Sequence, residues 1–132
     1  MVKYCLDTSI VIEIFRGNKE IIKKVGNLQM EEINFFVTHM TLCELYKGAF
    51  LHSKKEEKLK EIDELMLSCT ILDFSIKSCK LFGEIYSDLR KSGNLIPESD
   101  LIIAAIARSN DLILVTRDKK HFENTNVRLE VW

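Results

Sequence analysis

The sequence predicts an α/β fold in which a central parallel sheet of four to five strands lies between two layers of helices. Short apolar stretches alternate along the chain with longer amphipathic ones, and this alternation is typical of a parallel sheet covered on both faces. Two stretches are almost continuously apolar, namely Phe35–Val37 and Leu112–Val115. Such runs are typical of strands that are buried on both faces of a sheet. The 132 residues fit one domain, residues 1–132, and no linker or repeat divides them.

The first part of the chain is expected to contain two strands and two helices. Val2–Leu6 predicts a strand that leads directly into an acid. Ser9–Arg16 and Lys19–Leu28 predict helices, separated by a glycine and an asparagine that favour a break. Ile33–Val37 predicts the second strand because it is rich in residues with high β-propensity.

The middle of the chain predicts a pair of helices and a short strand. Apolar residues in Thr41–His52 recur at helical spacing and fall on one face. Lys54–Leu67 continues as a charged helix with a narrower apolar face, and Thr70–Asp73 predicts a short third strand.

The last part of the chain completes the alternation. Ile76–Lys91 predicts a helix, and Pro97–Arg108 predicts another with Pro97 at its first position, where proline is favoured. Leu112–Val115 is the fourth strand, and Val127–Val131 is expected to be the last.

Composition and charge limit the classes of function. Hydrophobic residues make up 46% and charged residues 30%, which is ordinary for a globular domain. The net charge of −1 is not the global signature of a nucleic-acid binder, so contact with a polyanion would need local basic patches or bound cations. No apolar run approaches the ~18 residues of a membrane span. An acid as early as Asp7 does not fit a signal peptide, and we therefore expect a cytoplasmic protein whose four cysteines are small buried residues in a reducing compartment.

Four acidic residues stand where an open α/β sheet places its chemistry. Asp7 directly follows the first strand, and Asp118 lies just beyond the fourth. Glu44 is expected in the first turn of the helix after the second strand, and Asp100 near the start of the helix before the fourth strand. A parallel sheet would bring these helix and strand ends to one edge.

Each acid taken alone has a purely structural alternative. Asp7 could cap the helix that follows it. Thr41 and Glu44 match the spacing of a capping box, so Glu44 could be a cap or a ligand. Asp100 could complement a helix dipole, and Asp118 could be a turn residue.

Taken together, the acids favour a metal site. The helix that begins near Asp100 is apolar nearly all round over Leu101–Ala107, so it is expected to be buried. A charge at the start of a buried helix needs a partner. No basic residue is close to Asp7 or Asp100 in the sequence. A divalent cation would balance converging carboxylates, and oxygen ligands favour Mg²⁺ or Mn²⁺ over zinc. Such an ion can activate water to hydrolyse a phosphodiester bond.

Further residues are candidates for supporting roles. The hydroxyls of Ser9 and Thr116 could orient a carboxylate or a bound water, although a cap or turn role is the structural alternative for each. Glu98, two residues before Asp100, is a weaker extra acid.

Basic residues cluster in three places. Arg117, Lys119 and Lys120 adjoin Asp118 and are the preferred candidates for contact with an RNA backbone. Two other clusters, Lys23-Lys24 and the lysines at positions 54–60, are expected to be solvated helix surfaces. The three histidines, His39, His52 and His121, are scattered, and none is expected to be a catalytic base.

The chain resembles the PIN-domain nucleases, and among them the VapC toxins of prokaryotic toxin–antitoxin pairs. Four stretches carry the resemblance, namely Tyr4–Ser9, Thr41–Leu45, Ile96–Ala105 and Leu114–Asp118 followed by Phe122. The motifs are individually short, but their order and spacing span the whole chain.

The resemblance implies a sheet of order 3-2-1-4-5, with Asp7, Glu44 and Asp100 as core metal-binding acids and Asp118 as a more variable fourth. It also implies Mg²⁺-dependent cleavage of RNA, commonly tRNA or ribosomal RNA. Members of the family typically form homodimers and are held inactive by a cognate antitoxin whose C-terminal segment covers the site. Ser9 and Arg117 stand where many relatives carry asparagine, and Pro97 replaces a frequent glycine.

Other interpretations remain open at this stage. A receiver domain needs an acidic pair after the first strand, and a haloacid-dehalogenase-like phosphatase needs a second aspartate where this chain has Ser9, so both are disfavoured. A PIN-like module could hold RNA or a partner without cutting. The same chemistry could also serve RNA processing or DNA cleavage.

Overall fold

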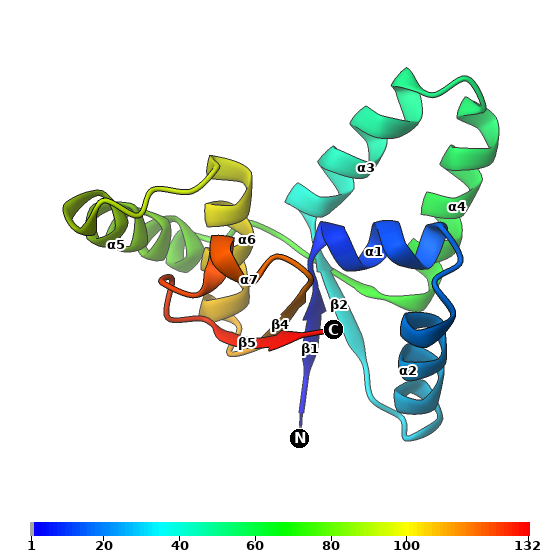
Figure 1. The fold of residues 1–132 in the computed structure, drawn as a ribbon, viewed down its shortest axis with the longest axis horizontal. Helices are drawn as coiled ribbons and strands as arrows, with labels where there is room; N and C mark the ends of the chain where they lie inside the picture. The colour runs from blue at the N-terminus through cyan, green and yellow to red at the C-terminus, as the bar shows by residue number, and fades with distance from the viewer. Residues whose placement is uncertain (1) are drawn as a thin grey trace.

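Five parallel strands form one sheet in the order β3-β2-β1-β4-β5 (Figure 1). The computed structural model describes residues 2–132. The strands are β1 (Tyr4–Leu6), β2 (Phe35–Thr38), β3 (Thr70–Leu72), β4 (Ile113–Thr116) and β5 (Arg128–Val131). The predicted α/β class and the order implied by the resemblance are both confirmed.

Seven helices connect and flank the strands within residues 2–132. They are α1 (Thr8–Phe15), α2 (Lys19–Met30), α3 (His39–Leu51), α4 (Lys55–Ser68), α5 (Ile76–Ser92), α6 (Glu98–Ser109) and α7 (Lys119–Phe122). Every element expected from the sequence is present, with its ends shifted by no more than two residues. The sequence does not predict the short helix α7, which begins directly after Asp118.

The sheet separates two groups of helices, with α1 to α4 on one side and α5 to α7 on the other (Figure 1). Side chains alternate between these two sides along each strand, as the pleat requires. Leu6 and Val115 belong to the core packed with α1 to α4, whereas Cys5 and Leu114 belong to the core packed with α6 and α7. Both faces of the central strands are therefore buried, which explains why these strands are apolar throughout.

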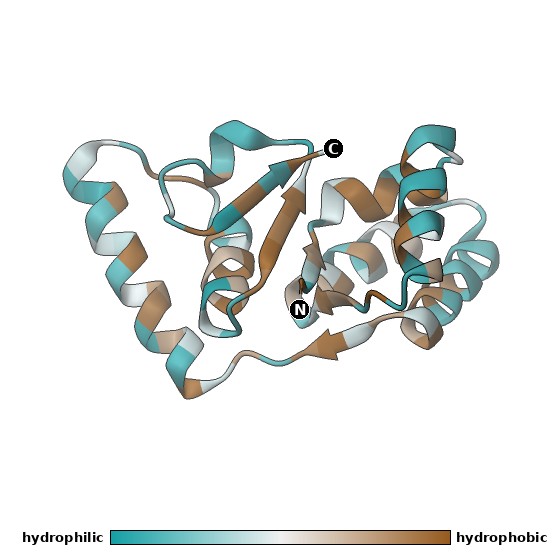
Figure 2. Ribbon diagram, turned by 90° about the horizontal axis from the view of Figure 1, so that it is seen from below, coloured by the Kyte–Doolittle hydropathy of each residue, from teal (hydrophilic) through white to brown (hydrophobic). Residues whose placement is uncertain are grey.

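Helix α6 is buried on two sides at once. Ile103, Ala104 and Ala107 pack toward the sheet, while Leu101 and Ala105 pack against α5. The outer helix α5 buries only one stripe, visible as alternating brown and teal bands in Figure 2. The apolar character of α6 all round thus follows from its place in the middle layer, and it fixes Asp100 at the edge of the core.

Helix α3 begins at His39, earlier than the predicted start at Thr41. Thr38 is its N-cap residue, and the Thr38 hydroxyl accepts a hydrogen bond from the backbone N–H of Thr41 at 3.2 Å. The proposed capping box of Thr41 and Glu44 is therefore wrong, and Glu44 lies in the second turn, where its carboxylate is free for another role. Pro97 likewise precedes α6 as its N-cap residue instead of opening the helix.

Two further expectations concern membrane-spanning helices and the burial of the cysteines. None of the helices in residues 2–132 is both long enough and apolar enough to cross a membrane. The cysteines are free thiols, but only Cys5 is fully buried; Cys43 and Cys79 are exposed, so the expectation that all four are buried is wrong. Cys43 lies on the exposed face of α3, and Cys79 lies on the exposed face of α5.

Candidate active site

Asp7 is the centre of the site and is held by backbone on both sides. Its N–H donates to the carbonyl of Val115 at 2.9 Å, which extends the pairing of β1 with β4, and its own carbonyl accepts from the first turn of α1. The side chain is only 4% exposed and makes no capping bond to α1. The carboxylate is therefore not used as a helix cap, which removes the structural alternative for this acid.

Two hydroxyl groups hold one oxygen of the Asp7 carboxylate. Thr116 Oγ1 donates to Oδ2 at 2.7 Å, and Ser9 Oγ donates to the same oxygen at 2.8 Å. Each hydroxyl also accepts from the chain after β4, Thr116 from Asp118 N–H at 2.9 Å and Ser9 from Arg117 N–H at 3.1 Å. The loop that carries Asp118 is thereby tied to Asp7 through two side chains.

The other oxygen of Asp7 has no such support. Oδ1 is buried and has no hydrogen-bond partner among the described residues. A buried carboxylate oxygen without a partner is costly, and such atoms in native proteins commonly mark a bound ion or water. This oxygen is the strongest structural indication that the site holds something beyond protein.

Glu44 reaches the same region from α3. Its Oε1 accepts a hydrogen bond from Thr8 Oγ1 at 2.8 Å, and Thr8 is the residue directly after Asp7. The first turn of α1 and the second turn of α3 are thus joined by a hydroxyl–carboxylate bond. Glu44 Oε2 is left for a further interaction.

Asp100 and Asp118 meet at a histidine. The Nδ1 atom of His121 lies 2.6 Å from Asp100 Oδ2 and 2.9 Å from Asp118 Oδ2. Asp100 is in the first turn of α6, Asp118 is the N-cap residue of α7, and His121 lies within α7. His121 was not predicted as a site residue, because no pattern in one sequence relates it to Asp100.

Burial and two of the other acids raise the pKa of Asp100. Burial, and after it the negative charge of Asp7, raise this pKa to about 6. The hydrogen bond and charge of His121 act in the opposite direction, while Glu44 adds to the increase. Carboxylates that repel one another in this way form a site where a cation is electrostatically favoured.

The donor set fits a hard divalent ion in its chemistry. The unpartnered Oδ1 of Asp7 and the carboxylate of Asp100 supply oxygen ligands of the kind that Mg²⁺ and Mn²⁺ prefer. Within residues 2–132, no group of three His, Cys, Asp or Glu side chains is arranged so that it could hold a metal ion by itself. Mg²⁺ usually keeps several waters and takes only one or two carboxylates, so a preformed cage is not needed.

The remaining predicted residues lie at the margin. Glu98 is exposed and forms no ion pair with another residue between positions 2 and 132, and its part in the site stays a prediction. Arg117, Lys119 and Lys120 are exposed beside Asp118 and are available to solvent.

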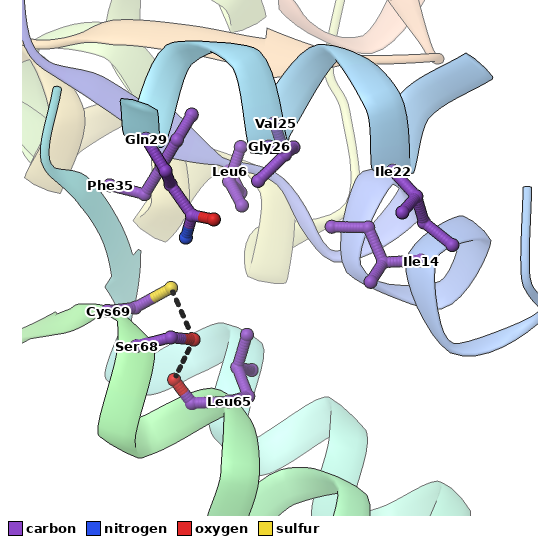
Figure 3. A pocket seen from close by; sticks show the side chains of 10 residues that line it. All are labelled: Leu6, Ile14, Ile22, Val25, Gly26, Gln29, Phe35, Leu65, Ser68 and Cys69. Carbon is purple, nitrogen blue, oxygen red and sulfur yellow. Dashed lines mark hydrogen bonds between the residues drawn. The ribbon is translucent and has the colours of Figure 1, made fainter. Parts of the chain in front are cut away.

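An apolar cavity elsewhere in the molecule is distinct from this site. It has a volume of about 320 Å³ and lies between α2 and α4, where Ile22 and Val25 point into it from α2 and Leu65 from α4 (Figure 3). None of the four acids lines it. The four acids therefore form a candidate site that is separate from this cavity.

The fold and the arrangement of acids define the class of protein. The PIN-domain family model matches residues 4–127, and the chain therefore belongs to the PIN-domain family. Within that family, the relatives that match over their full length include VapC proteins. The chain is 36% identical over 133 residues to "Ribonuclease VapC2" of Haemophilus influenzae, covering 100% of this chain and 99% of that protein. It is 29% identical to the "tRNA(fMet)-specific endonuclease VapC" of Shigella flexneri, with the same coverage.

Solved structures of VapBC complexes contain a chain with the same fold as this one. The chain superposes on the crystal structure of VapBC2 from Rickettsia felis bound to a promoter DNA fragment with a TM-score of 0.91, at 27% identity and 99% coverage of both chains. The DNA-bound VapBC of Salmonella typhimurium also has a TM-score of 0.91, at 28% identity, over 100% of this chain and 99% of that one.

Proposed function

We propose that this chain is an endoribonuclease that hydrolyses RNA phosphodiester bonds and acts as the toxin of a toxin–antitoxin pair. The observation that carries the proposal is the buried carboxylate of Asp7, with one oxygen held by two hydroxyls and the other without a partner among residues 2–132. The names of the full-length relatives, which are ribonucleases and a tRNA-specific endonuclease, support RNA as the substrate.

In this proposal Asp7, Glu44, Asp100 and Asp118 together hold Mg²⁺ or Mn²⁺. The ion, when bound, supplies a nucleophilic water at neutral pH and offsets charge on the phosphate oxygens. The chain's own contribution is to fix the ligands. Thr116 and Ser9 lock Oδ2 of Asp7 so that Oδ1 is left for the ion, and Thr8 does the same for one oxygen of Glu44.

The test is a cleavage assay with Mg²⁺ or Mn²⁺, against EDTA, on tRNA, ribosomal RNA and single-stranded DNA. The wild type is expected to cut RNA only when the metal is present. Asp7→Asn is expected to abolish cutting and Asp88→Asn, an exposed acid of α5, to leave it unchanged. Cutting of DNA alone would favour DNA cleavage as the role, and metal-independent RNA binding without cutting would favour a binding module.

We further propose a cognate antitoxin, a homodimeric state and a cytoplasmic location. The similar solved structures are VapBC complexes, which supports a protein partner for this chain. Co-expression with the product of a short adjacent reading frame should yield a stable complex without nuclease activity. Light scattering on the isolated chain would measure its oligomeric state, and a mass of one chain would contradict the dimer.

A further inference from the structure

A groove runs between α2 and the end of β5 on the side of the sheet that carries α1 to α4. It has a volume of about 490 Å³, and we call it the basic groove; its lining residues include Lys23, Lys24, Asn27, Arg117, Val131 and Trp132. Helix α2 contributes to two hollows, because Ile22 and Val25 point into the apolar cavity of Figure 3 while Lys23 and Lys24 line the basic groove.

The basic groove presents cations that no acid neutralises. Lys23, Lys24 and Arg117 are exposed, and none of them forms an ion pair with any other residue between positions 2 and 132. The groove also contains one acid, Glu20, so the lining carries an excess of positive charge. Unpaired cations gathered in one hollow are available to an anionic ligand.

A second groove, next to Glu44, differs in this respect. It is lined by Glu44 and by apolar residues of α1, α3 and α4, and its two cations are matched by acids. Arg16 lies 3.8 Å from Glu13, and Lys58 lies 3.5 Å from Glu61. Of these two grooves, the basic groove is therefore the one that favours a polyanion.

Trp132 fixes the position of one of the cations. Its backbone N–H donates to the Thr116 carbonyl at 3.1 Å, and its ring packs edge-on against Tyr4 and Phe35. The ammonium of Lys24 lies 4.7 Å from the centre of this ring, a cation–π contact. The charge is thus held at the groove before any ligand arrives, which lowers the entropic cost of binding.

Arg117 connects the basic groove to the acids. It directly precedes Asp118, and its N–H donates to Ser9 Oγ, the same hydroxyl that donates to Asp7 Oδ2. Arg117 therefore links the lining of the basic groove to the residues that hold Asp7 and Asp118.

We propose that the basic groove binds the single-stranded RNA segment next to the scissile phosphate, with backbone phosphates on Arg117, Lys24 and Lys23. This inference rests on the proposed ribonuclease function and adds a path for the substrate. Recognition is by charge on the backbone, so it positions the strand and does not read its sequence.

The experiment measures binding without cleavage. Asp7→Asn serves as the parent, a fluorescein-labelled single-stranded RNA as the probe, and anisotropy over a range of KCl as the readout. In the parent, Lys23→Gln with Lys24→Gln is expected to weaken binding and to reduce the slope of log affinity against log salt by about 1.4, since each phosphate of a single strand that a cation neutralises adds about 0.7 to that slope. The matched pair Lys54→Gln with Lys55→Gln, at the tip of the α3–α4 hairpin, should leave both quantities unchanged.

Failure of the inference can be told from failure of the proposed function. If wild type cuts RNA, the Lys23/Lys24 variant binds as its Asp7→Asn parent does, and the same two lysine substitutions made in wild type leave cutting unchanged, the groove is not the substrate path, although the nuclease stands. If neither wild type nor parent binds RNA, both are overturned. A labelled poly-glutamate peptide that binds through Lys23 and Lys24 while RNA does not would replace RNA by an acidic protein segment and overturn the inference.

Discussion

His121 lies between two acids, with its Nδ1 atom 2.6 Å from Oδ2 of Asp100, a residue that is 21 positions away in the chain. This contact joins α7 to the start of α6 and holds down the pKa of Asp100, which burial and the charge of Asp7 raise. Among residues 2–132, it is the one basic side chain in ion-pairing distance of the four acids.

Replacing His121 should therefore raise the pKa of Asp100 further. His121→Ala removes the hydrogen bond and the charge that favour the ionised carboxylate, so the carboxyl should hold its proton to higher pH. An NMR titration of the Asp100 carboxyl carbon in metal-free protein measures this. His52→Ala, an exposed histidine at the end of α3, is the control, and an unchanged midpoint in His121→Ala would contradict the assignment.

The pH dependence of stability should carry the signature of Asp100. Its pKa in the folded protein is about 6, against an ordinary value of 3.8, so the folded state binds this proton more tightly than the unfolded state does. The stability contributed by this group is full below about pH 4 and is lost as pH rises through 6. Thermal unfolding of metal-free wild type, compared with Asp100→Asn, should show this loss only in the wild type.

Mg²⁺ should counteract the loss of stability that follows when pH rises through the pKa of Asp100. The reason is that a divalent ion competes with the proton for the Asp100 carboxylate. The rise in melting temperature on adding Mg²⁺ should be larger at pH values above the Asp100 pKa of about 6 than below it. A rise of the same size on both sides would indicate that Mg²⁺ does not use this carboxylate.

Asp7→Asn should leave the fold intact and remove the response to metal. The asparagine oxygen can accept the bonds from Thr116 and Ser9, and the repulsion with Asp100 disappears. The melting temperature without metal should be equal to or above that of the wild type, with no increase on adding Mg²⁺. A large loss of stability without metal would mean that the Asp7 charge is structural.

Thr116→Val should destabilise the protein although the side chains have nearly the same shape. The fully buried hydroxyl donates to Asp7 and accepts from Asp118 N–H, and valine can make neither bond. The expected decrease is about 1 to 3 kcal/mol in the free energy of unfolding, measured by urea titration. Thr70→Val, at an exposed position of β3, controls for the change of residue type; equal effects at both positions would show that the hydroxyl network contributes nothing.

Much of this arrangement could be predicted from the sequence because it depends on local patterns. Apolar runs marked the buried strands, and the parallel direction of the sheet then placed Asp7 and Asp118 at one edge. The helix of Asp100 was recognised as buried from its apolar residues alone. The strand order came from the resemblance to a known family, since periodicity does not reveal which strands are neighbours.

The parts that were missed depend on short elements or long-range contacts. Helix α7 has four residues, too few for an apolar period to appear. The spacing of Asp118 and His121, three residues apart, was the available signal for their contact, but it has meaning only once α7 is known. The sequence predicts Lys24 to be a solvated surface residue, because nothing in it indicates that Trp132 lies under the Lys24 ammonium group.

The parallel course of all five strands has a practical consequence for experiments on this chain. Val2 and Lys3, which precede β1, lie at the amino edge of the sheet, whereas Trp132 lies at the carboxyl edge, hydrogen-bonded to Thr116. A purification tag fused after Trp132 would start at the mouth of the basic groove and could mask or mimic a ligand there. A tag fused ahead of β1 would start on the far side of the sheet, so amino-terminal fusions are the better choice for every assay described above.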